Sequence, residues 1–343
     1  MRVSPARIKL RMEQINQIGR SAAGGWTRLA FSPEDFQARQ LVMAMMEELG
    51  LLVTVDPAGN IIGRLEAGAD GPVVATGSHL DTVVNAGMFD GVAGVVAALE
   101  AVETIKERGY KLRCPVEVIV FSDEEGVRFH AGLLGSRAIA GRVDPVELEQ
   151  KRDAGGVSLA DAFVQMGLDP QQIGKARAMP GKYKSFFELH IEQGGVLEES
   201  GNSIGVVEAI KGIYWLRGTY RGQGDHAGAT PMSLRKDALL AVSELHCRLE
   251  KMAQDIGDPF VVTMGQLGIQ PNAINTIPAQ ANFSLDIRDI REDRWLKAIN
   301  SILVEGQRIA EKRGLVFEAE ELKKEAPFKF AEETISFLAR ICQ

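Results

Sequence analysis

The pattern of apolar residues in the first part of the chain predicts buried strands that alternate with helices. Apolar, β-branched runs at 72–77 and 116–121 predict two buried strands, and the Ala- and Val-rich residues 91–108 predict a helix between them. Ser32-Pro33-Glu34-Asp35 predicts the start of another helix, which ends at Gly50. This alternation predicts an α/β layer with a largely parallel sheet.

The pattern changes after Gly212, where strand, helix, strand, strand, helix and strand follow one another. This order predicts a small α+β sandwich with a four-stranded sheet and one open face. The predicted elements are residues 213–221, 233–256, 260–267, 281–288, 291–313 and 315–319. We therefore place an inserted domain at 212–322, between segments 1–211 and 323–343 of a larger domain. Residues 328–341 have the spacing of one amphipathic helix.

Composition excludes several classes of protein. The net charge of −7, without a cluster of lysine and arginine, argues against nucleic-acid binding. The three cysteines are scattered and predict neither a disulfide framework nor a zinc-binding pair. We see no signal peptide and no apolar run of the roughly 20 residues that a membrane helix needs. These features predict a cytoplasmic protein that does not bind membranes.

Imidazoles and carboxylates gather in four short motifs near predicted strand ends. They are Gly77-Ser78-His79-Leu80-Asp81, Phe89-Asp90-Gly91, Asp123-Glu124-Glu125-Gly126 and His190-Ile191-Glu192. Two of the five histidines of the chain lie in this set. Because α/β sheets bind ligands where strands end, the motifs predict a hydrolase with two metal ions.

Each motif residue has an expected task. His79 and Asp81 lie on the same side of a strand, so His79 can bind a metal while Asp81 holds its other ring nitrogen. Asp90 precedes a glycine at a helix entrance, where a carboxylate can bridge two ions. Of the adjacent Glu124 and Glu125, one can bind metal while the other takes a proton from water. His190 supplies a second imidazole, and this N/O donor set suits Zn²⁺, Mn²⁺, Co²⁺ or Ni²⁺.

Plain structural readings compete with these assignments. A histidine at a strand end is usually a surface residue, and paired glutamates usually lie in a solvated loop. The occurrence of all four motifs in one α/β layer favours the metal site. His246 lies within a predicted helix and is interpreted as structural, whereas the role of His130 stays open.

Longer motifs resemble the hydantoinase/carbamoylase family of amidohydrolases, which is related to dinuclear metallopeptidases. They include Gly-Ser-His-Leu-Asp-Thr-Val, Gly-Met-Phe-Asp-Gly-Val-Ala-Gly, Asp-Glu-Glu-Gly-Val-Arg-Phe, Glu-Leu-His-Ile-Glu-Gln-Gly-Gly-Val-Leu-Glu, Gly-Asp-His-Ala-Gly-Ala-Thr-Pro-Met and Pro-Asn-Ala-Ile-Asn-Thr-Ile-Pro. The resemblance runs from about residue 10 to about residue 325. It implies a dinuclear-metallopeptidase-like catalytic domain at 1–211 and 323–343, and a dimerisation or lid domain at 212–322.

The resemblance also implies a division of roles in the metal site. His79 and His190 would bind one ion, Glu125 the other, and Asp90 would bridge them. Glu124 would be the general base, taking a proton from a bridging water and delivering it to the leaving nitrogen.

Four further residues would contact the substrate. The resemblance implies that His226, reaching in from the other subunit of a homodimer, polarises the scissile carbonyl, and that Gln193 lines the pocket. It also implies that Asn272 and Arg288 hold a free substrate carboxylate. Arg288 lies on the opposite strand face from the apolar residues, and its alternative is an ion pair with Asp286 or Asp289.

The sequence departs from the family pattern at its C-terminal end. Family members continue for several tens of residues and supply one more metal-binding histidine, but no histidine follows His246 here. We therefore expect a truncated catalytic domain with uncovered apolar surface and with weak or no activity on its own.

Five functions remain in competition. The first is hydrolysis of N-carbamoyl-L-amino acids to the amino acid, CO₂ and ammonia. Its close rivals are allantoate amidohydrolase and β-ureidopropionase, which share every motif. An aminopeptidase fits less well, because Gln193, Asn272 and Arg288 favour a small substrate with a free carboxylate. A catalytically silent dimer is the alternative from a different class.

Overall fold

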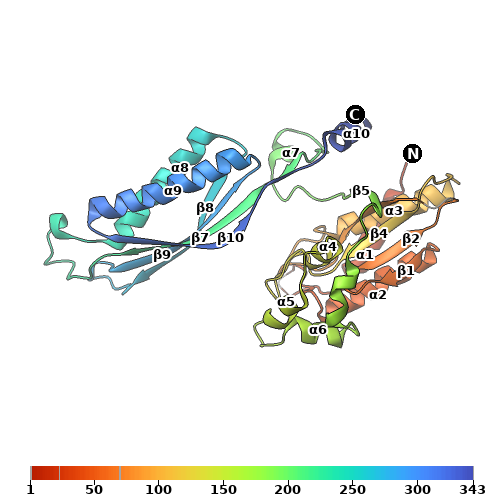
Figure 1. The fold of residues 1–343 in the computed structure, drawn as a ribbon, viewed down its shortest axis with the longest axis horizontal. Helices are drawn as coiled ribbons and strands as arrows, with labels where there is room; N and C mark the ends of the chain where they lie inside the picture. Colours follow the sequence, from red (N-terminus) through yellow and green to blue (C-terminus); the bar gives the residue numbers. More distant parts are fainter. Residues whose placement is uncertain (1, 23, 69–70, 343) are drawn as a thin grey trace. The chain divides into compact units, whose positions relative to one another are not determined.

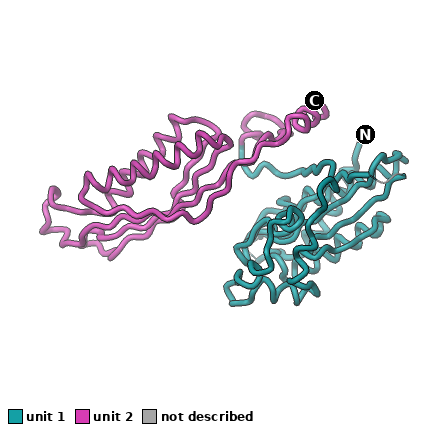
Figure 2. Tube along the Cα trace, in the orientation of Figure 1, with its two compact units in different colours: residues 1–195 teal, residues 196–343 magenta. Residues whose placement is uncertain are grey.

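A computed structural model describes residues 2–22, 24–68 and 71–342 and divides the chain into two compact units. The first unit spans residues 1–195 and the second 196–343 (Figure 1, Figure 2). Among the described residues, none of the helices combines the length and the apolar character that crossing a membrane requires.

The first unit is built on a five-stranded sheet of order β1-β2-β4-β3-β5. Strand β3 pairs in parallel with β4 and β5, whereas β1 and β2 form a hairpin that joins β4 in antiparallel orientation. The α/β class is confirmed, and the parallel part of the sheet is its β4-β3-β5 portion. The strands are β1 (Leu52–Val55), β2 (Ile61–Leu65), β3 (Val73–His79), β4 (Val116–Phe121) and β5 (Tyr183–Phe187).

Three helices bury their apolar faces in one core with this sheet. They are α1 (Pro5–Ile15), α2 (Pro33–Glu48) and α3 (Val92–Glu107). The start of α2 follows its predicted signal, since the Ser32 hydroxyl accepts the amide N–H of Asp35 at 3.2 Å. The sequence pattern did not reveal α1, because this helix is largely polar and its buried residues are Met12 and Ile15.

A second, smaller core of the first unit contains its shorter helices. Phe31, Phe129 and Phe163 lie at its centre, with ring centroids of Phe31 and Phe163 5.1 Å apart. The helices of this region are α4 (Leu134–Ile139), α5 (Pro145–Gln150), α6 (Leu159–Gln165) and the 3₁₀ helix η1 (Pro170–Ala176).

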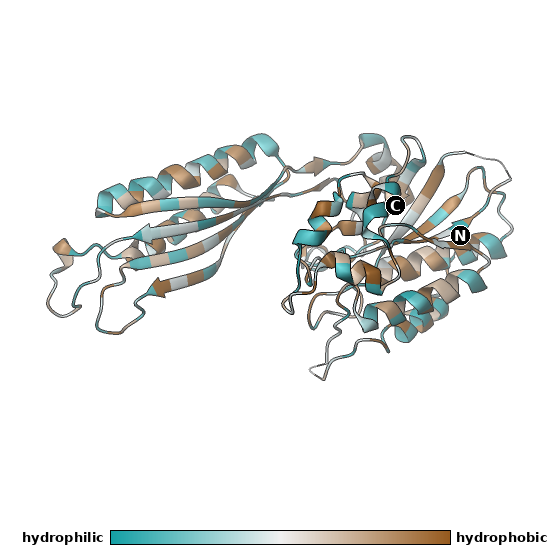
Figure 3. Cartoon of the chain, turned by 60° about the horizontal axis from the view of Figure 1, so that its bottom comes forward, coloured by the Kyte–Doolittle hydropathy of each residue, from teal (hydrophilic) through white to brown (hydrophobic). Residues whose placement is uncertain are grey.

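The second unit contains the predicted four-stranded sheet, in the order β10-β7-β9-β8. All neighbouring strands are antiparallel, and α8 and α9 pack on one face of the sheet (Figure 1). Hydrophobic and hydrophilic residues alternate along these elements (Figure 3), as a sheet with one open face requires. The elements are β7 (Gly212–Arg221), η2 (Met232–Leu234), α8 (Ala238–Ile256), β8 (Val261–Gln270), β9 (Gln280–Asp289), α9 (Glu292–Arg313) and β10 (Val316–Glu325).

The compact units do not coincide with the predicted domain boundaries. Residues 196–211 and 323–343 fall in the second unit, where β6 (Ala209–Ile210) pairs with β11 (Phe328–Lys329). The single helix expected at 328–341 is wrong in its first turn, because β11 precedes α10 (Glu332–Ile341). The segment around α7 (Val196–Glu199) belongs to the same unit. Whether these segments form part of a catalytic domain stays a prediction.

Glu100 joins α1 to α3 through a buried charge. Its side chain is fully buried and accepts the Arg7 Nε–H at 2.8 Å, the Arg7 Nη2–H at 2.7 Å and the Ser4 amide N–H at 2.7 Å. The Thr104 hydroxyl donates to it at 3.1 Å. Hydrogen bonds from Arg7 outweigh the cost of burial and lower the pKa of Glu100 to about 2.

Replacing this carboxylate should destabilise the first unit. We expect Glu100→Ala to lower the free energy of unfolding by about 2–3 kcal/mol, because Arg7 and the Ser4 amide lose a charged partner. The pKa of Glu100 is below its ordinary 4.5, so the stabilisation is present above that pH and declines as pH falls toward about 2. Urea unfolding at neutral pH and at about pH 3.5 measures both effects.

The exposed Glu13, which faces Lys9 at 3.8 Å, provides the control. Glu13→Ala should change the free energy of unfolding by less than about 0.5 kcal/mol. Equal effects of the two substitutions, or a Glu100→Ala effect that does not shrink in acid, would contradict this account.

Candidate metal centre

The candidate metal ligands of the first unit gather where three parallel strands end. His79 is the last residue of β3 and lies beside Phe121, the last residue of β4. Glu124 and Glu125 lie three and four residues after the end of β4, and His190 lies three residues after the end of β5. Strand β5 ends at Phe187, so His190 lies in irregular backbone. The carboxyl edge of the sheet thus brings together motifs that are far apart in sequence.

Two overlapping groups of side chains can each hold a cation. His79, Asp90 and His190 form one group, and His79, Glu124 and Glu125 form the other. The donor atoms within each group lie within 4.8 Å of one another. His190 Nε2 is 3.3 Å from Asp90 Oδ1, and His79 Nε2 is 3.6 Å from Glu124 Oε2. His79 belongs to both groups, so they are contiguous, but its one free ring nitrogen can bind a single ion.

Both histidines present the ring nitrogen that a metal needs. His79 Nδ1 lies 2.9 Å from the carbonyl oxygen of Asp81, and His190 Nδ1 lies 2.9 Å from that of Ile191. A carbonyl oxygen only accepts, so each Nδ1 carries the hydrogen and each Nε2 keeps a free lone pair. These Nε2 atoms are the ones that face the carboxylates. The donor set therefore fits a divalent cation.

The Asp81 side chain does something other than the predicted task. Its carboxylate accepts the amide N–H of Glu124 at 3.2 Å and that of Glu125 at 3.0 Å. Its Oδ1 is 3.8 Å from His79 Nδ1, which bonds instead to the Asp81 backbone carbonyl. The expected pairing of the Asp81 carboxylate with the His79 ring is therefore wrong. The buried carboxylate instead accepts hydrogen bonds from two backbone amides.

A glycine lets Asp90 approach His79 closely. Gly91 has φ +64° and caps α3, and a Cβ there would lie 2.5 Å from the His79 ring. Asp90 therefore stands at the N-terminus of α3, where the helix dipole favours a negative charge. Gln193 Nε2 donates to both Asp90 oxygens, at 3.2 and 3.0 Å. Gln193, predicted to line a substrate pocket, thus orients this carboxylate.

The site concentrates several carboxylates in a buried region, and burial disfavours their ionised form. Burial raises the pKa of Glu124, and burial followed by the charge of Glu124 raises the pKa of Glu125 to about 7. Burial also raises the pKa of Asp123 well above its usual range, aided by Asp81. For His79, burial lowers the pKa, but the charges of Asp81 and Glu124 together outweigh it and raise the pKa. A bound cation would compensate this charge.

Three predicted substrate residues lie in the second unit, on or beside its sheet. His226 is bridged to Thr276 and its Nδ1 accepts the Gly228 amide N–H at 3.1 Å, so the loop is not a loose linker. Asn272 is exposed and adopts φ +57° in the connection between β8 and β9. Arg288 makes the alternative ion pair with Asp286, with Nη2 2.8 Å from Oδ2.

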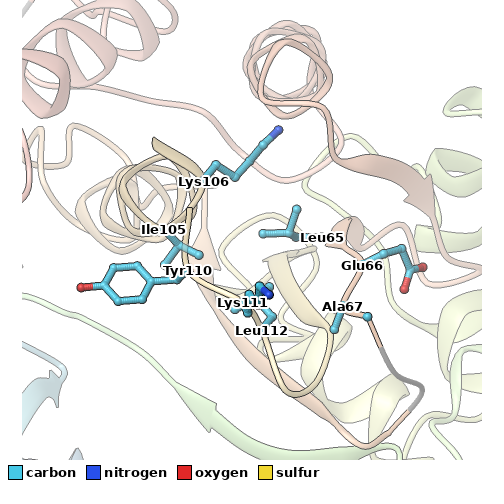
Figure 4. A pocket seen from close by; sticks show the side chains of 9 residues that line it. Leu65, Glu66, Ala67, Ile105, Lys106, Tyr110, Lys111 and Leu112 are labelled. Carbon is cyan, nitrogen blue, oxygen red and sulfur yellow. The ribbon is translucent and has the colours of Figure 1, made fainter. Parts of the chain in front are cut away.

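Neither described cavity contains a candidate metal ligand. One, of about 400 Å³, is lined by Leu65, Ile105 and Leu112 together with Lys106 and Lys111 (Figure 4). The other, of about 670 Å³, includes Thr276, the bridge partner of His226. The candidate centre is therefore recognised by its donor atoms and not by an enclosed space.

Sequence reasoning missed Glu188, whose carboxylate accepts the Ser78 hydroxyl at 2.6 Å. Its charge helps to raise the pKa of Glu124. Its position two residues before His190 is the only signal that the sequence offers. His130 is exposed and, among the described residues, belongs to neither metal-binding group.

Comparisons with known proteins identify the family of the chain. Residues 75–343 match the model of Peptidase family M20/M25/M40. The chain is 43% identical over 338 residues to an N-carbamoyl-L-amino acid amidohydrolase of Geobacillus stearothermophilus, covering 98% of this chain and 82% of the relative. It is 41% identical to allantoate amidohydrolase of Escherichia coli, covering 80% of this chain and 66% of that protein.

A solved structure is similar over the same extent. A hydantoinase/carbamoylase family amidase from Burkholderia ambifaria shares 32% sequence identity with a TM-score of 0.89. The alignment covers 98% of this chain and 82% of the amidase.

The single free nitrogen of each imidazole predicts similar effects of two substitutions on metal content. His190→Ala removes a donor of one ion, so we expect about one tightly bound ion instead of about two. His79→Ala removes a donor of the same ion, because one Nε2 lone pair binds one cation, and should likewise leave about one. Elemental analysis after gel filtration in Zn²⁺ or Mn²⁺ measures the ratio.

His246, exposed on α8 of the second unit, provides a histidine control. His246→Ala should keep the wild-type metal content. Two ions retained by His79→Ala would show that the donors assigned here do not hold the metals.

Proposed function

The chain belongs to Peptidase family M20/M25/M40 and to its hydantoinase/carbamoylase amidases, and from this premise we propose that it hydrolyses N-carbamoyl-L-amino acids. It is a hydrolase of C–N bonds, as its amidohydrolase relatives are. The proposed products are the free amino acid, CO₂ and ammonia. The observation that carries the proposal is the convergence of imidazole and carboxylate donors in two overlapping groups, one of which contains Glu124.

We assign the metal-binding role to His79, Asp90, Glu125 and His190. Their imidazole nitrogens and carboxylate oxygens suit Zn²⁺, Mn²⁺, Co²⁺ or Ni²⁺. Two such ions, when bound, would supply positive charge that polarises the scissile carbonyl and activates water. Asp81 keeps the Glu124 and Glu125 backbone in place through its two amide hydrogen bonds.

Glu124 is proposed as the general base. Burial raises its pKa, which brings the carboxyl closer to the pH at which it can both accept and return a proton. Its Oε2 faces the site, 3.6 Å from His79 Nε2. Glu124 would take the proton of the attacking water and pass it to the leaving nitrogen.

His226 is proposed as a hydrogen-bond donor to the substrate carbonyl oxygen. Because its Nδ1 accepts the Gly228 amide N–H, the neutral ring carries its hydrogen on Nε2. A donor at Nε2 can stabilise negative charge that develops on a carbonyl oxygen. The β-bridge between His226 and Thr276 holds the backbone of His226 in place.

Arg288 and Asn272 are proposed to bind the substrate carboxylate. Arg288 projects from the face of β9 opposite the buried Phe283, Leu285 and Ile287. Asp286 engages its Nε and Nη2 and orients the guanidinium, so the ion pair serves positioning. A planar guanidinium is well suited to a carboxylate.

The choice among substrates rests on the curated relatives. The N-carbamoyl-L-amino acid amidohydrolases of Geobacillus stearothermophilus and Paenarthrobacter aurescens are 43% and 41% identical to this chain over most of its length. The Escherichia coli allantoate amidohydrolase reaches 41% over a shorter alignment of 279 residues. Allantoate is therefore the second candidate, since it shares the free carboxylate and a linear C–N bond.

Side-by-side assays test the proposal. Protein loaded with Mn²⁺, Co²⁺, Ni²⁺ or Zn²⁺ should release ammonia from N-carbamoyl-L-methionine faster than from allantoate. Glu124→Gln should reduce kcat about 10²–10⁴-fold with unchanged metal content, since only proton transfer is lost. A preference for allantoate would replace the first candidate by the second. Absence of turnover with both ions bound would favour a catalytically silent protein.

We also propose a cytoplasmic homodimer. Cys114, Cys247 and Cys342 are free cysteines, as a reducing compartment favours. The open sheet face of the second unit carries the half-exposed Trp215, which a partner could cover. The resemblance further suggests that His226 serves the active site of the partner subunit.

Mixed dimers test this exchange of residues. A dimer with Glu124→Gln in one subunit and His226→Ala in the other should keep one intact site if His226 acts across the interface. Co-expressed, differently tagged subunits purified as heterodimers should then show about half the wild-type kcat per dimer. If His226 acts within its own subunit, both sites carry a defect and the heterodimer should be as inactive as the parents.

A further inference from the structure

The backbone pairing of β3 and β5 stops before the two histidines that they carry. The last paired residues are Thr76 and Phe187, and His79 and His190 each lie three residues beyond. The centroids of the two imidazole rings are nevertheless 6.0 Å apart. Among the described residues, no β-ladder pair between β3 and the segment after Phe187 sets this spacing. Contacts other than ladder pairs therefore set it.

One side-chain hydrogen bond spans this gap. The Ser78 hydroxyl donates to Glu188 Oε1 at 2.6 Å. Ser78 is fully buried and directly precedes His79, while Glu188 lies two residues before His190. Ser78 is also held from its other side, because it is paired with Val120 in the parallel β3–β4 ladder. The bond therefore links the segment that carries His190 to the rigid centre of the sheet.

Gly94 of α3 closes the same junction. A Cβ at Gly94 would lie 2.5 Å from the Leu189 carbonyl oxygen and 2.7 Å from Ser78 Cβ. The first turn of α3 therefore packs directly on both segments, which only a residue without a side chain permits. We name Ser78, Glu188 and Gly94 the histidine clamp.

We propose that the histidine clamp sets the separation of His79 and His190 and thereby the affinity of the protein for its metal ions. The proposal rests on the proposed metal centre and assigns Ser78 and Glu188 as positioning residues. Their hydrogen bond acts through geometry, so an uncharged acceptor at position 188 should serve as well as the carboxylate. Outer residues that orient metal ligands typically contribute a 10- to 100-fold difference in affinity.

Zinc titration of the metal-free protein tests the clamp. We expect Ser78→Ala and Glu188→Ala to raise the Kd for Zn²⁺ about 10- to 100-fold, measured by competition with a fluorescent chelator. Glu188→Gln keeps an acceptor for the Ser78 hydroxyl and should stay within about threefold of wild type. Gly94→Ala places a Cβ of α3 against the Leu189 carbonyl, which must move. This substitution should therefore also raise the Kd for Zn²⁺.

Ser158 supplies a matched control. Its hydroxyl donates to an Asp161 carboxylate oxygen at the same 2.6 Å, at the start of α6 and outside both metal-binding groups. Ser158→Ala should lower the urea midpoint about as much as Ser78→Ala while leaving the Kd for Zn²⁺ unchanged. This comparison separates a general loss of stability from a loss of histidine positioning.

Two results would overturn the proposal. The first is a wild-type Kd for Zn²⁺ in both Ser78→Ala and Glu188→Ala. The second is a Glu188→Gln variant as weak as Glu188→Ala, which would assign the effect to the charge of Glu188. Failure of the proposed function is distinguishable, since the wild type would then bind Zn²⁺ tightly, with the predicted variant effects, yet release no ammonia from N-carbamoyl-L-methionine.

Discussion

The Asp81 carboxylate is the contact on which the candidate metal centre depends. The carboxylate accepts the amide N–H groups of Glu124 and Glu125, which follow a different strand. The backbone carbonyl of Asp81 accepts the Nδ1–H of His79. One residue thereby sets the orientation of the His79 imidazole and the position of the Glu124 and Glu125 backbone. The parallel register that places His79 beside Phe121 makes this contact possible.

This arrangement has an electrostatic cost that the surrounding fold offsets in part. Asp35, Asp81 and Asp123 are all buried, and burial raises the pKa of Asp35 to about 6. The buried Arg28 supplies a positive charge nearby and donates from Nε to the Leu80 carbonyl, between His79 and Asp81, at 3.1 Å. The remaining negative charge faces the site. A buried region that keeps such an excess of negative charge is suited to bind cations.

Sequence reasoning succeeded where the signal is local. The strand at Val116–Phe121 and the helix ends near Gly50 and Gly314 follow from apolar runs and capping residues. It missed α1, although Ser4 caps this helix and Pro5 begins it; Arg7 and Ser4 also bind Glu100, about 95 residues away. It failed where a distant contact decides: the first residues of the expected helix at 328–341 form a strand because they pair with β6.

The sequence by itself determined the chemistry of the protein: the imidazoles and carboxylates of the centre, their placement after strands, and the alternation that makes an α/β layer and a four-stranded sandwich. These properties reside in residue type and short-range periodicity. Only the tertiary structure decided which atoms meet. The two Asp81 amide bonds and the Ser78–Glu188 bond depend on where backbones and side chains lie in three dimensions. Such contacts join residues as much as 110 positions apart, a separation that no local pattern encodes.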